Sequence, residues 1–224
     1  MMAPLAKPPS AMKMAVRTAV ILFLFVVVFT GLLSGAYLWT QPTIAAAAAE
    51  EKMTLIDEVL PRTSYDNDLL KDALQLPASA ALGQQQASTA YRARQRGTVS
   101  ALVLEAVAAD GYAGKIRLLI AFAADGAVLG VRVTQHKETP GLGDYIEPKK
   151  DKNPQRPWIT QFDGLNPNRL DAREWKVKKD GGRFDSVAGA TVTPRAVIKA
   201  IGKAAQYVEE NREQLFAARP GEAK

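Results

Sequence analysis

The chain has 224 residues, of which 47% are hydrophobic, and a formal net charge of +6 at pH 7. It contains no cysteine, which excludes disulfides, thiolate-bound iron–sulfur clusters, haem attached through a Cys-x-x-Cys-His motif and a cysteine nucleophile. His136 is the only histidine, so a metal site built from several histidines is excluded as well. Any electron carrier must therefore be organic or held by other ligands.

A long uncharged segment comes first along the chain. Residues 18–39 carry no charge, and as a helix they would cross about 30 Å of hydrocarbon. Tyr37 and Trp39 close this run, as aromatic residues do at a membrane interface. A cleaved signal peptide is the alternative, but the run exceeds the usual apolar region of about 7–15 residues. We therefore predict one transmembrane helix over residues 18–39.

The charges that flank this segment predict its orientation. Lys7, Lys13 and Arg17 precede it without an acidic residue, whereas residues 40–49 are uncharged. The positive-inside rule then places residues 1–17 in the cytoplasm and the main domain in the periplasm, with the helix in a bacterial cell inner membrane. These three cations leave a net charge of +3 (6 − 3) on the rest of the chain, which implies no nucleic-acid partner.

Residues 40–94 are predicted to form a stalk and a connection. The alanine run at 45–49 favours a helical stalk over residues 45–58, which Pro61 ends. A second helical patch is expected around Leu69, Leu70 and Leu74, followed by a surface stretch rich in Ala, Gln and Ser. Further predictions are a packing stripe on the stalk (Ile56, Val59 and Leu60) and a solvated basic run (Arg92, Arg94 and Arg96).

The next region, residues 95–212, is predicted to be an α+β domain. Alternating residues from 99 to 103 and β-rich runs at 115–123 and 127–134 indicate an antiparallel meander of three strands, with Asp125-Gly126 as a hairpin turn. Residues 147–157 form a charged, proline-bearing excursion that should be exposed. Strands and helices do not alternate along this region, so a parallel sheet is not predicted. Residues 213–224 are predicted to be a C-terminal tail.

A small-residue turn before the last helix is the candidate site. Residues 185–193 read DSVAGATVT and run into Pro194, so Thr193 is predicted as N-cap and Pro194 as first helical residue. The predicted buried face of this helix comprises Val197, Ile198, Ile201, Ala205 and Val208. Gly189 and Ala190 would let a ligand approach the helix N-terminus, where a phosphate fits.

Two motifs of this chain resemble segments of the FMN-binding domain family. One is the turn ending in Gly189-Ala190-Thr191, and the other is residues 136–143, which read HKETPGLG. Residues 111–116 and 158–162 also resemble family positions. The resemblance implies FMN joined to Thr191 by a phosphodiester bond, which a separate flavin transferase makes from FAD with a divalent metal. Ala188 departs from the family pattern, which has Ser or Thr there.

The resemblance also implies which other residues surround the flavin. Those beside the isoalloxazine are in the upstream motif, and those near the phosphate flank the acceptor threonine. His136 is either a neighbour of the flavin or a polar residue that ends a strand. The remaining predicted cofactor-binding residues are Glu138, Thr139, Leu142, Gly143, Gly189, Ala190, Val192 and Thr193.

With one membrane anchor in front, the layout resembles the G-subunit family of Rnf ion-translocating electron transport complexes. It implies a flavoprotein subunit that relays electrons between a ferredoxin-type donor and NAD, with other membrane and peripheral subunits as partners. Three alternatives stay open: a C subunit of a sodium-pumping NADH:quinone reductase, a non-redox anchored binding or assembly module, and a free-standing anchored reductase. Covalent flavin on the chain would exclude the non-redox module.

Overall fold

The computed structural model describes residues 10–217 in two units, one ending at Glu50 and a compact one beginning at Glu51. Helix α1 (Ala11–Val59) runs through the first unit into the second. Lys7 and residues 218–224 of the predicted tail lie outside the described residues.

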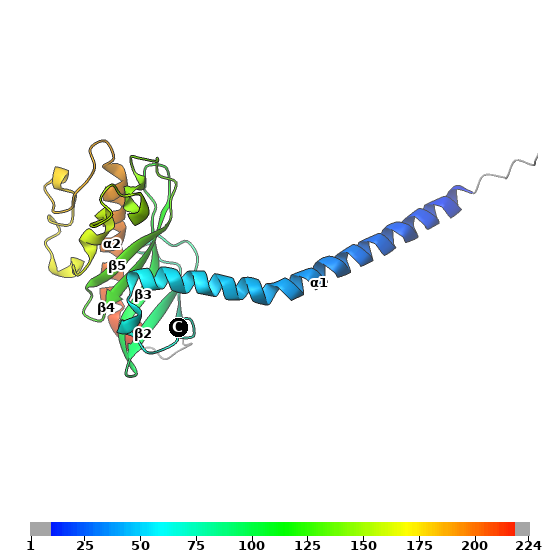
Figure 1. Cartoon of the computed structure of the whole chain (residues 1–224), viewed down its shortest axis with the longest axis horizontal. Helices are drawn as coiled ribbons and strands as arrows, with labels where there is room; N and C mark the ends of the chain where they lie inside the picture. Colours follow the sequence, from blue (N-terminus) through cyan, green and yellow to red (C-terminus); the bar gives the residue numbers. More distant parts are fainter. Residues whose placement is uncertain (1–9, 218–224) are drawn as a thin grey trace, which may run out of the picture. The chain divides into compact units, whose positions relative to one another are not determined.

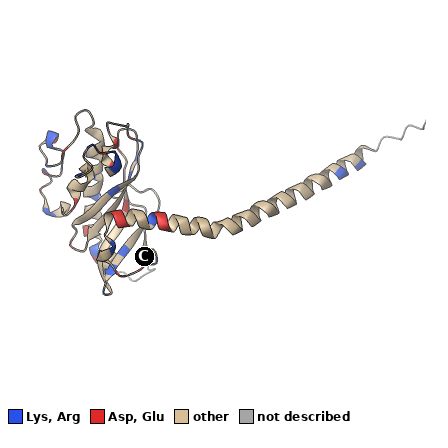
Figure 2. Cartoon of the chain, viewed as in Figure 1, with Lys and Arg blue, Asp and Glu red and all other residues tan. Residues whose placement is uncertain are grey.

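The first unit is an apolar helix whose side chains face outward. No charged residue lies between Arg17 and Glu50, and this stretch is uniformly tan in Figure 2. Large apolar side chains are exposed along it, including Phe23 (67%) and Leu33 (70%). Within residues 10–217, α1 is the one helix long and apolar enough to cross a membrane. Exposed apolar side chains of this kind fit the lipid environment predicted for residues 18–39.

The second unit is built on a five-stranded antiparallel meander in the order β1-β2-β3-β4-β5 (Figure 1). The strands are β1 (Ala73–Leu76), β2 (Ser88–Gln95), β3 (Thr98–Ala108), β4 (Ile116–Ala123) and β5 (Val128–Gln135). The α+β prediction is confirmed, and Gly126 turns the chain between β4 and β5 with a φ of +86°.

Side chains alternate between the two faces of the sheet along each strand, so both faces carry apolar residues. Helices cover both faces. One face buries Leu102, Leu104 and Phe122 against helix α2 (Val192–Glu210) and α3 (Arg212–Ala217). The other face buries Val103 and Leu119 against the last turns of α1. The two packing faces predicted from the sequence are buried as expected: Ile56 and Val59 on α1 with Leu60 directly after it, and Val197, Ile198, Ile201, Ala205 and Val208 on α2.

The sheet extends further towards the N-terminus than the sequence pattern predicts. The helical patch expected around Leu74 is wrong, because Leu74 lies in β1 and pairs with Ala90 of β2. The surface stretch expected before residue 95 likewise contains β2. β1 is short and β2 is polar, so strand pairing decides their conformation rather than local propensity: β1 pairs with β2, and β2 pairs with β3.

The solvated basic run is wrong for Arg92, which is fully buried. Its Nε and Nη2 donate to Oδ1 of Asp72 at 2.8 and 2.5 Å, and Nε of Arg94 donates to Oδ2 at 2.5 Å. Arg92 and Arg94 share a face because they are two residues apart on a strand. Arg96 is the exposed member.

Loops and short 3₁₀ helices connect β5 to α2. These helices are η2 (Asp144–Ile146), η3 (Pro148–Lys150), η4 (Trp158–Phe162), η5 (Pro167–Arg169) and η6 (Lys178–Asp180), and η1 (Arg62–Ser64) follows α1. Most of the predicted excursion at 147–157 is exposed. The start of the predicted tail is instead the helix α3, which buries Leu215.

Candidate functional site

The two sequence motifs meet at one cavity of about 230 Å³, between the loop after β5 and the N-terminus of α2. Of the nine predicted cofactor-binding residues, eight line it, and Thr191 lies between two of them in the chain. Tyr112 completes the wall. The lining consists of Tyr112, Glu138, Thr139, Leu142, Gly143, Gly189, Ala190, Val192 and Thr193.

Glu138 joins the three segments that form the cavity. Its carboxylate is 4% exposed, and Oε1 accepts the backbone N–H of Ala113 at 3.0 Å. Oε2 accepts the hydroxyl of Thr193 on α2. Gly143 leaves room for this contact, since a Cβ there would lie 2.8 Å from Oγ1 of Thr193 and 2.9 Å from Oε2 of Glu138. The carboxylate therefore fixes the turn at 111–114, its own loop and the start of α2.

The helix start differs from the predicted one by two residues. Helix α2 begins at Val192, with Thr191 rather than Thr193 in the N-cap position. Thr193 is not a cap because its hydroxyl is buried and engaged with Glu138. The Thr191 hydroxyl makes no capping hydrogen bond, and the residue is half-buried. An accessible hydroxyl thus lies beside the first N–H groups of the helix, which have no intrahelical partners.

The turn that carries Thr191 is held from behind by aromatic and amide side chains. The Tyr145 hydroxyl lies 3.4 Å from both the N–H of Val187 and the carbonyl of Ala190. Burial raises the pKa of Tyr145 to about 12, so the hydroxyl keeps its proton at neutral pH. Nε1 of Trp158 donates to the Asp185 carbonyl at 2.5 Å, and Oε1 of Gln161 accepts the Asp185 N–H at 2.8 Å.

His136 lies at the end of β5, outside the cavity wall. Its Nδ1 accepts the N–H of Glu138 at 3.1 Å, and its Nε2 lies 3.3 Å from Glu147. The Lys150 ammonium, helped by His136, lowers the pKa of Glu147 below its ordinary value. His136 therefore orients the loop rather than lining the cavity.

Two residues at the site were missed by sequence reasoning. Tyr112 lies within residues 111–116, which resemble family positions, between Gly111 and Gly114. Its place in the sequence does not distinguish a residue that lines a cavity from one in an ordinary turn. Tyr145 follows the second motif by two residues and carries no local signal, because its contact with Ala190 spans 45 positions.

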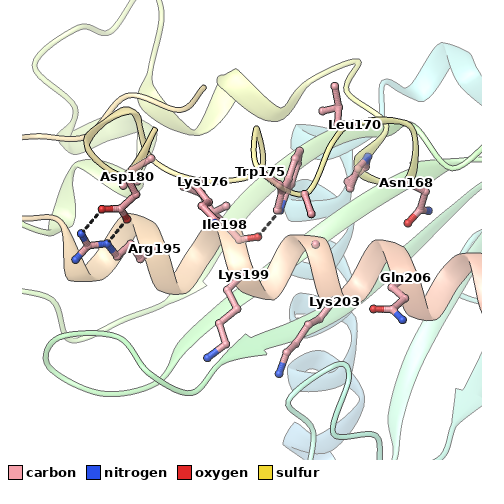
Figure 3. A pocket seen from close by; sticks show the side chains of 14 residues that line it. Asn168, Leu170, Trp175, Lys176, Asp180, Arg195, Ile198, Lys199, Lys203 and Gln206 are labelled. Atoms are coloured by element: carbon pink, nitrogen blue, oxygen red, sulfur yellow. Dashed lines mark hydrogen bonds and ion pairs between the residues drawn. The ribbon is translucent and has the colours of Figure 1, made fainter. Parts of the chain in front are cut away.

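A larger hollow of about 530 Å³ lies along the outer side of α2 (Figure 3). Trp175 lies over Gly202, where a Cβ would be 2.6 Å from its Nε1, and that nitrogen donates to the Ile198 carbonyl at 2.8 Å. Arg195 binds Asp180 through two hydrogen bonds of 2.7 Å. The larger volume of this hollow does not make it the candidate flavin site, since none of the predicted cofactor-binding residues lines it.

The smaller cavity has the features that a flavin phosphate and ring require. The N-terminus of α2 supplies the positive end of a helix dipole, and Gly189 has a φ of +84°, which turns the chain tightly before Thr191. Leu142 and Val192 offer apolar contact at 48% and 44% exposure. An aromatic ring placed against them would remove apolar surface from water. These residues therefore fit FMN.

Comparison with known proteins gives the class first. The model of the family described as FMN-binding domain matches residues 111–206, and that of the RnfG N-terminal region matches residues 2–59. The folded unit thus contains an FMN-binding domain.

The particular family follows from the relatives. The chain is 46% identical over 201 residues to the G subunit of an ion-translocating oxidoreductase complex from Pseudomonas aeruginosa, covering 90% of this chain and 92% of that protein. The G subunit of the complex of the same name from Pseudoalteromonas atlantica is 39% identical over 202 residues, with 90% and 92% covered. The chain therefore belongs to the family of G subunits of ion-translocating oxidoreductase complexes.

Among solved structures, the crystal structure of Shewanella oneidensis NqrC is similar, with 20% identity and a TM-score of 0.45 over 70% of this chain and 74% of that one. A likeness at this level adds nothing to the assignment.

Proposed function

We propose that this chain is a membrane-anchored flavoprotein subunit that relays electrons through FMN bound covalently to Thr191. The other subunits of an Rnf-type complex supply and remove the electrons and couple them to ion transport. The observation that carries the proposal is the half-buried Thr191 hydroxyl, free of a capping bond at the N-terminus of α2, beside a cavity walled by both flavin motifs.

Two hydroxyls near the cavity differ in their availability. The Thr193 hydroxyl is 1% exposed and donates to Glu138, so an incoming phosphate would have to break that bond. Thr191 has no such commitment at the helix cap. Attachment at Thr191 would also place the phosphate at the helix N-terminus, where N–H groups and the dipole stabilise negative charge. Thr191 is thus the favoured acceptor.

The attachment step needs an outside enzyme. In this step the Thr191 oxygen would form a bond to the FMN phosphorus of FAD, the pyrophosphate bond would break with AMP as the leaving group, and the hydroxyl proton would pass to a base. Threonine is a weak nucleophile without a base. The buried carboxylate near it, Glu138, is already engaged, because each of its oxygens accepts a hydrogen bond, one from Ala113 and one from Thr193. The base and the metal therefore belong to a flavin transferase, for which this chain is the substrate.

Once bound, FMN supplies reversible electron transfer, and the protein orients it and tunes its potential. Gly189, Ala190, Val192 and Thr193 would surround the phosphate. Thr139, Leu142 and Gly143 would contact the ring, and Glu138 would hold these two segments together. Leu142 and Val192 would keep water from part of the ring.

The anchor and its flanking charges support the proposed membrane placement. Lys13 and Arg17 lie at the start of α1, and the uncharged stretch follows them. The proposal puts these cations in the cytoplasm, the helix in the bacterial inner membrane and the folded unit, including residues 95–212, in the periplasm.

Co-expression with a flavin transferase tests the proposal. After denaturation, the full chain should show flavin fluorescence on a gel and a mass increment equal to FMN minus water. Thr191→Ala should abolish both signals. Ser186→Ala removes a hydroxyl from the same turn and should retain them. Absence of covalent flavin on the intact chain, with the transferase active on another substrate, would overturn the proposal.

A further inference from the structure

The hollow along the outer side of α2 has no part in the flavin site, since it shares no lining residue with the flavin cavity. Its volume of about 530 Å³ lies within the range of about 300–1,000 Å³ that ligand sites occupy. One wall is α2, and the other is the segment 167–180, which includes η5 and η6 (Figure 3). The hollow is therefore large enough to receive side chains of a binding partner.

The floor of the hollow is apolar and is held in place from behind. Leu170, Trp175, Val177 and Ile198 supply its apolar surface. The Trp175 ring packs almost perpendicular to that of Phe184, with 4.7 Å between centroids, and its Nε1 donates to the Ile198 carbonyl. Because these contacts fix the ring, the floor loses little conformational freedom when a partner binds.

Positive charge predominates around this floor. Arg195, Lys199 and Lys203 are four residues apart on α2, so they lie along one face of the helix. Two of these cations are already paired. Arg195 binds Asp180 of η6 through two hydrogen bonds. Nζ of Lys199 lies 2.6 Å from Oδ2 of Asp110.

Two lysines at the hollow remain unpaired. Lys176 and Lys203 are exposed, and neither forms an ion pair with any of residues 10–217. The lining carries four cations and one carboxylate. Even when Asp110 beside it is counted, the formal net charge is +2 (4 − 2). A negatively charged partner complements this surface.

The hollow is elongated along α2, which favours an extended partner over a compact one. Arg195 and Gln206 both line it, and 11 residues of helix span about 16 Å. An extended peptide of about five residues covers this length at about 3.3 Å per residue. Side chains of such a peptide alternate in direction, so an apolar one can face the floor while its neighbours face the lysines.

We propose that this hollow binds an extended, acidic segment of another subunit of the complex. An apolar side chain of the segment would lie on the floor at Trp175, and its carboxylates would pair with Lys176 and Lys203. The chain's membership of a family of complex subunits supplies such partners, and the charge of the hollow selects an acidic one. The inference does not depend on covalent FMN, because the hollow and the flavin cavity share no residue.

Carbodiimide cross-linking of the purified full complex tests for the acidic segment. The reagent joins an amine to a carboxylate in direct contact, with loss of one water and without a spacer. Mass mapping should find Lys176 or Lys203 joined to Asp or Glu of another subunit, in a segment that also carries an apolar residue. The Lys199–Asp110 pair is the internal control, because it should link within the chain in every sample.

Amine labelling measures how fully the hollow is covered. The full chain alone and the full complex are treated with the same acetylating reagent. Lys176 and Lys203 should react about tenfold more slowly in the complex. Their protection should shrink at about 1 M salt, where the screening length falls to about 3 Å. Lys149 and Lys152 are exposed lysines outside the hollow and should react alike in both samples.

Lys203→Glu tests whether one segment contacts both lysines. In the complex, this variant should raise the labelling rate of Lys176 to nearly that of the isolated chain, because the shared segment is repelled. Lys149→Glu makes the same charge change outside the hollow and should leave Lys176 protected. Lys203→Gln is the milder variant if the charge reversal does not fold. FMN content should equal that of the wild type in each variant.

Other results would overturn the inference. Equal labelling of Lys176 and Lys203 in chain and complex would show that no subunit covers the hollow. Protection without a cross-link to a carboxylate of another subunit would assign the surface to a different partner, such as an anionic lipid. Cross-links only to a second copy of this chain would contradict the choice of partner. A wild-type chain without covalent FMN would overturn the proposed function alone, so the two failures are distinguishable.

Discussion

Buried polar groups occur in two regions of the folded unit with different partners. At the sheet, Asp72 binds two guanidinium groups, those of Arg92 and Arg94. At the cavity, Glu138 binds a hydroxyl and a backbone N–H. The first arrangement joins β2 to the segment before β1, far from the cavity lining. The second joins loops that form the site. The ion pairs of Asp72 hold the strands of the fold together, whereas the hydrogen bonds that Glu138 accepts from neutral donors hold the walls of the cavity in place.

The largest expected effect is at the sheet. Asp72→Asn should lower the free energy of unfolding by about 3–5 kcal/mol, because Arg92 loses the carboxylate that compensates its buried charge. Chemical denaturation of the full chain in detergent would measure the change. Asp68→Asn, at an exposed position, should change stability by less than about 0.5 kcal/mol. Equal effects of the two variants would refute the distinction between the regions.

Thr193→Val should have a smaller effect on stability. The variant keeps the side-chain shape but removes the donor to Glu138, and it should cost about 1–3 kcal/mol because the carboxylate keeps only its bond from Ala113. Covalent FMN should remain on Thr191, as peptide mass mapping would report. Loss of FMN attachment in this variant would show that Thr193, not Thr191, is the acceptor.

Tyr145→Phe should cost about 0.5–1.5 kcal/mol, since one hydroxyl that contacts the turn is lost. Thermal unfolding would measure it. Tyr207→Phe is the control, because this half-buried tyrosine on α2 lies away from the turn. A larger loss from the control would contradict the role given to Tyr145.

The smallest effect concerns pH. Lys150 and His136 lower the pKa of Glu147 in the folded protein, so their contribution is present above the ordinary pKa of 4.5 and is lost as pH falls through the lowered value. The pair is partly exposed, which limits the contribution to about 1 kcal/mol or less. Glu147→Gln should therefore reduce stability at pH 7 but not at a pH below the lowered pKa. An unchanged difference at both pH values would count against this assignment.

The two site motifs could be recognised in the sequence more readily than the first two strands, for a physical reason, while their role in binding FMN stays a prediction. Residues 136–143 and 185–193 are turns in which Gly141 and Gly189 adopt the positive φ that glycine permits, and Pro140 restricts the backbone of the first turn, so each motif carries its own geometry. Their meeting at one cavity agreed with the family resemblance. By contrast, β1 depends on pairing with β2 and β2 on pairing with β3, and burial of Arg92 depends on Asp72, 20 positions away. Periodicity within one segment does not encode such partners.

Helix boundaries show the same limit. The pattern identified the buried face of α2 correctly but not its first residue, because the Thr193 hydroxyl binds Glu138, 55 positions away, rather than capping its own helix. Tyr145 was missed for a similar reason. Local capping preferences compete with tertiary hydrogen bonds, and here the tertiary bond prevails.

Peptide mapping of the flavinylated chain tests the central claim most directly. Trypsin should release residues 184–195, which contain Ser186, Thr191 and Thr193. Fragmentation of this peptide should place FMN on Thr191, with no signal on the other two hydroxyls and none in Thr191→Ala. FMN on Thr193 or Ser186, or an unmodified peptide beside an active transferase, would contradict the account.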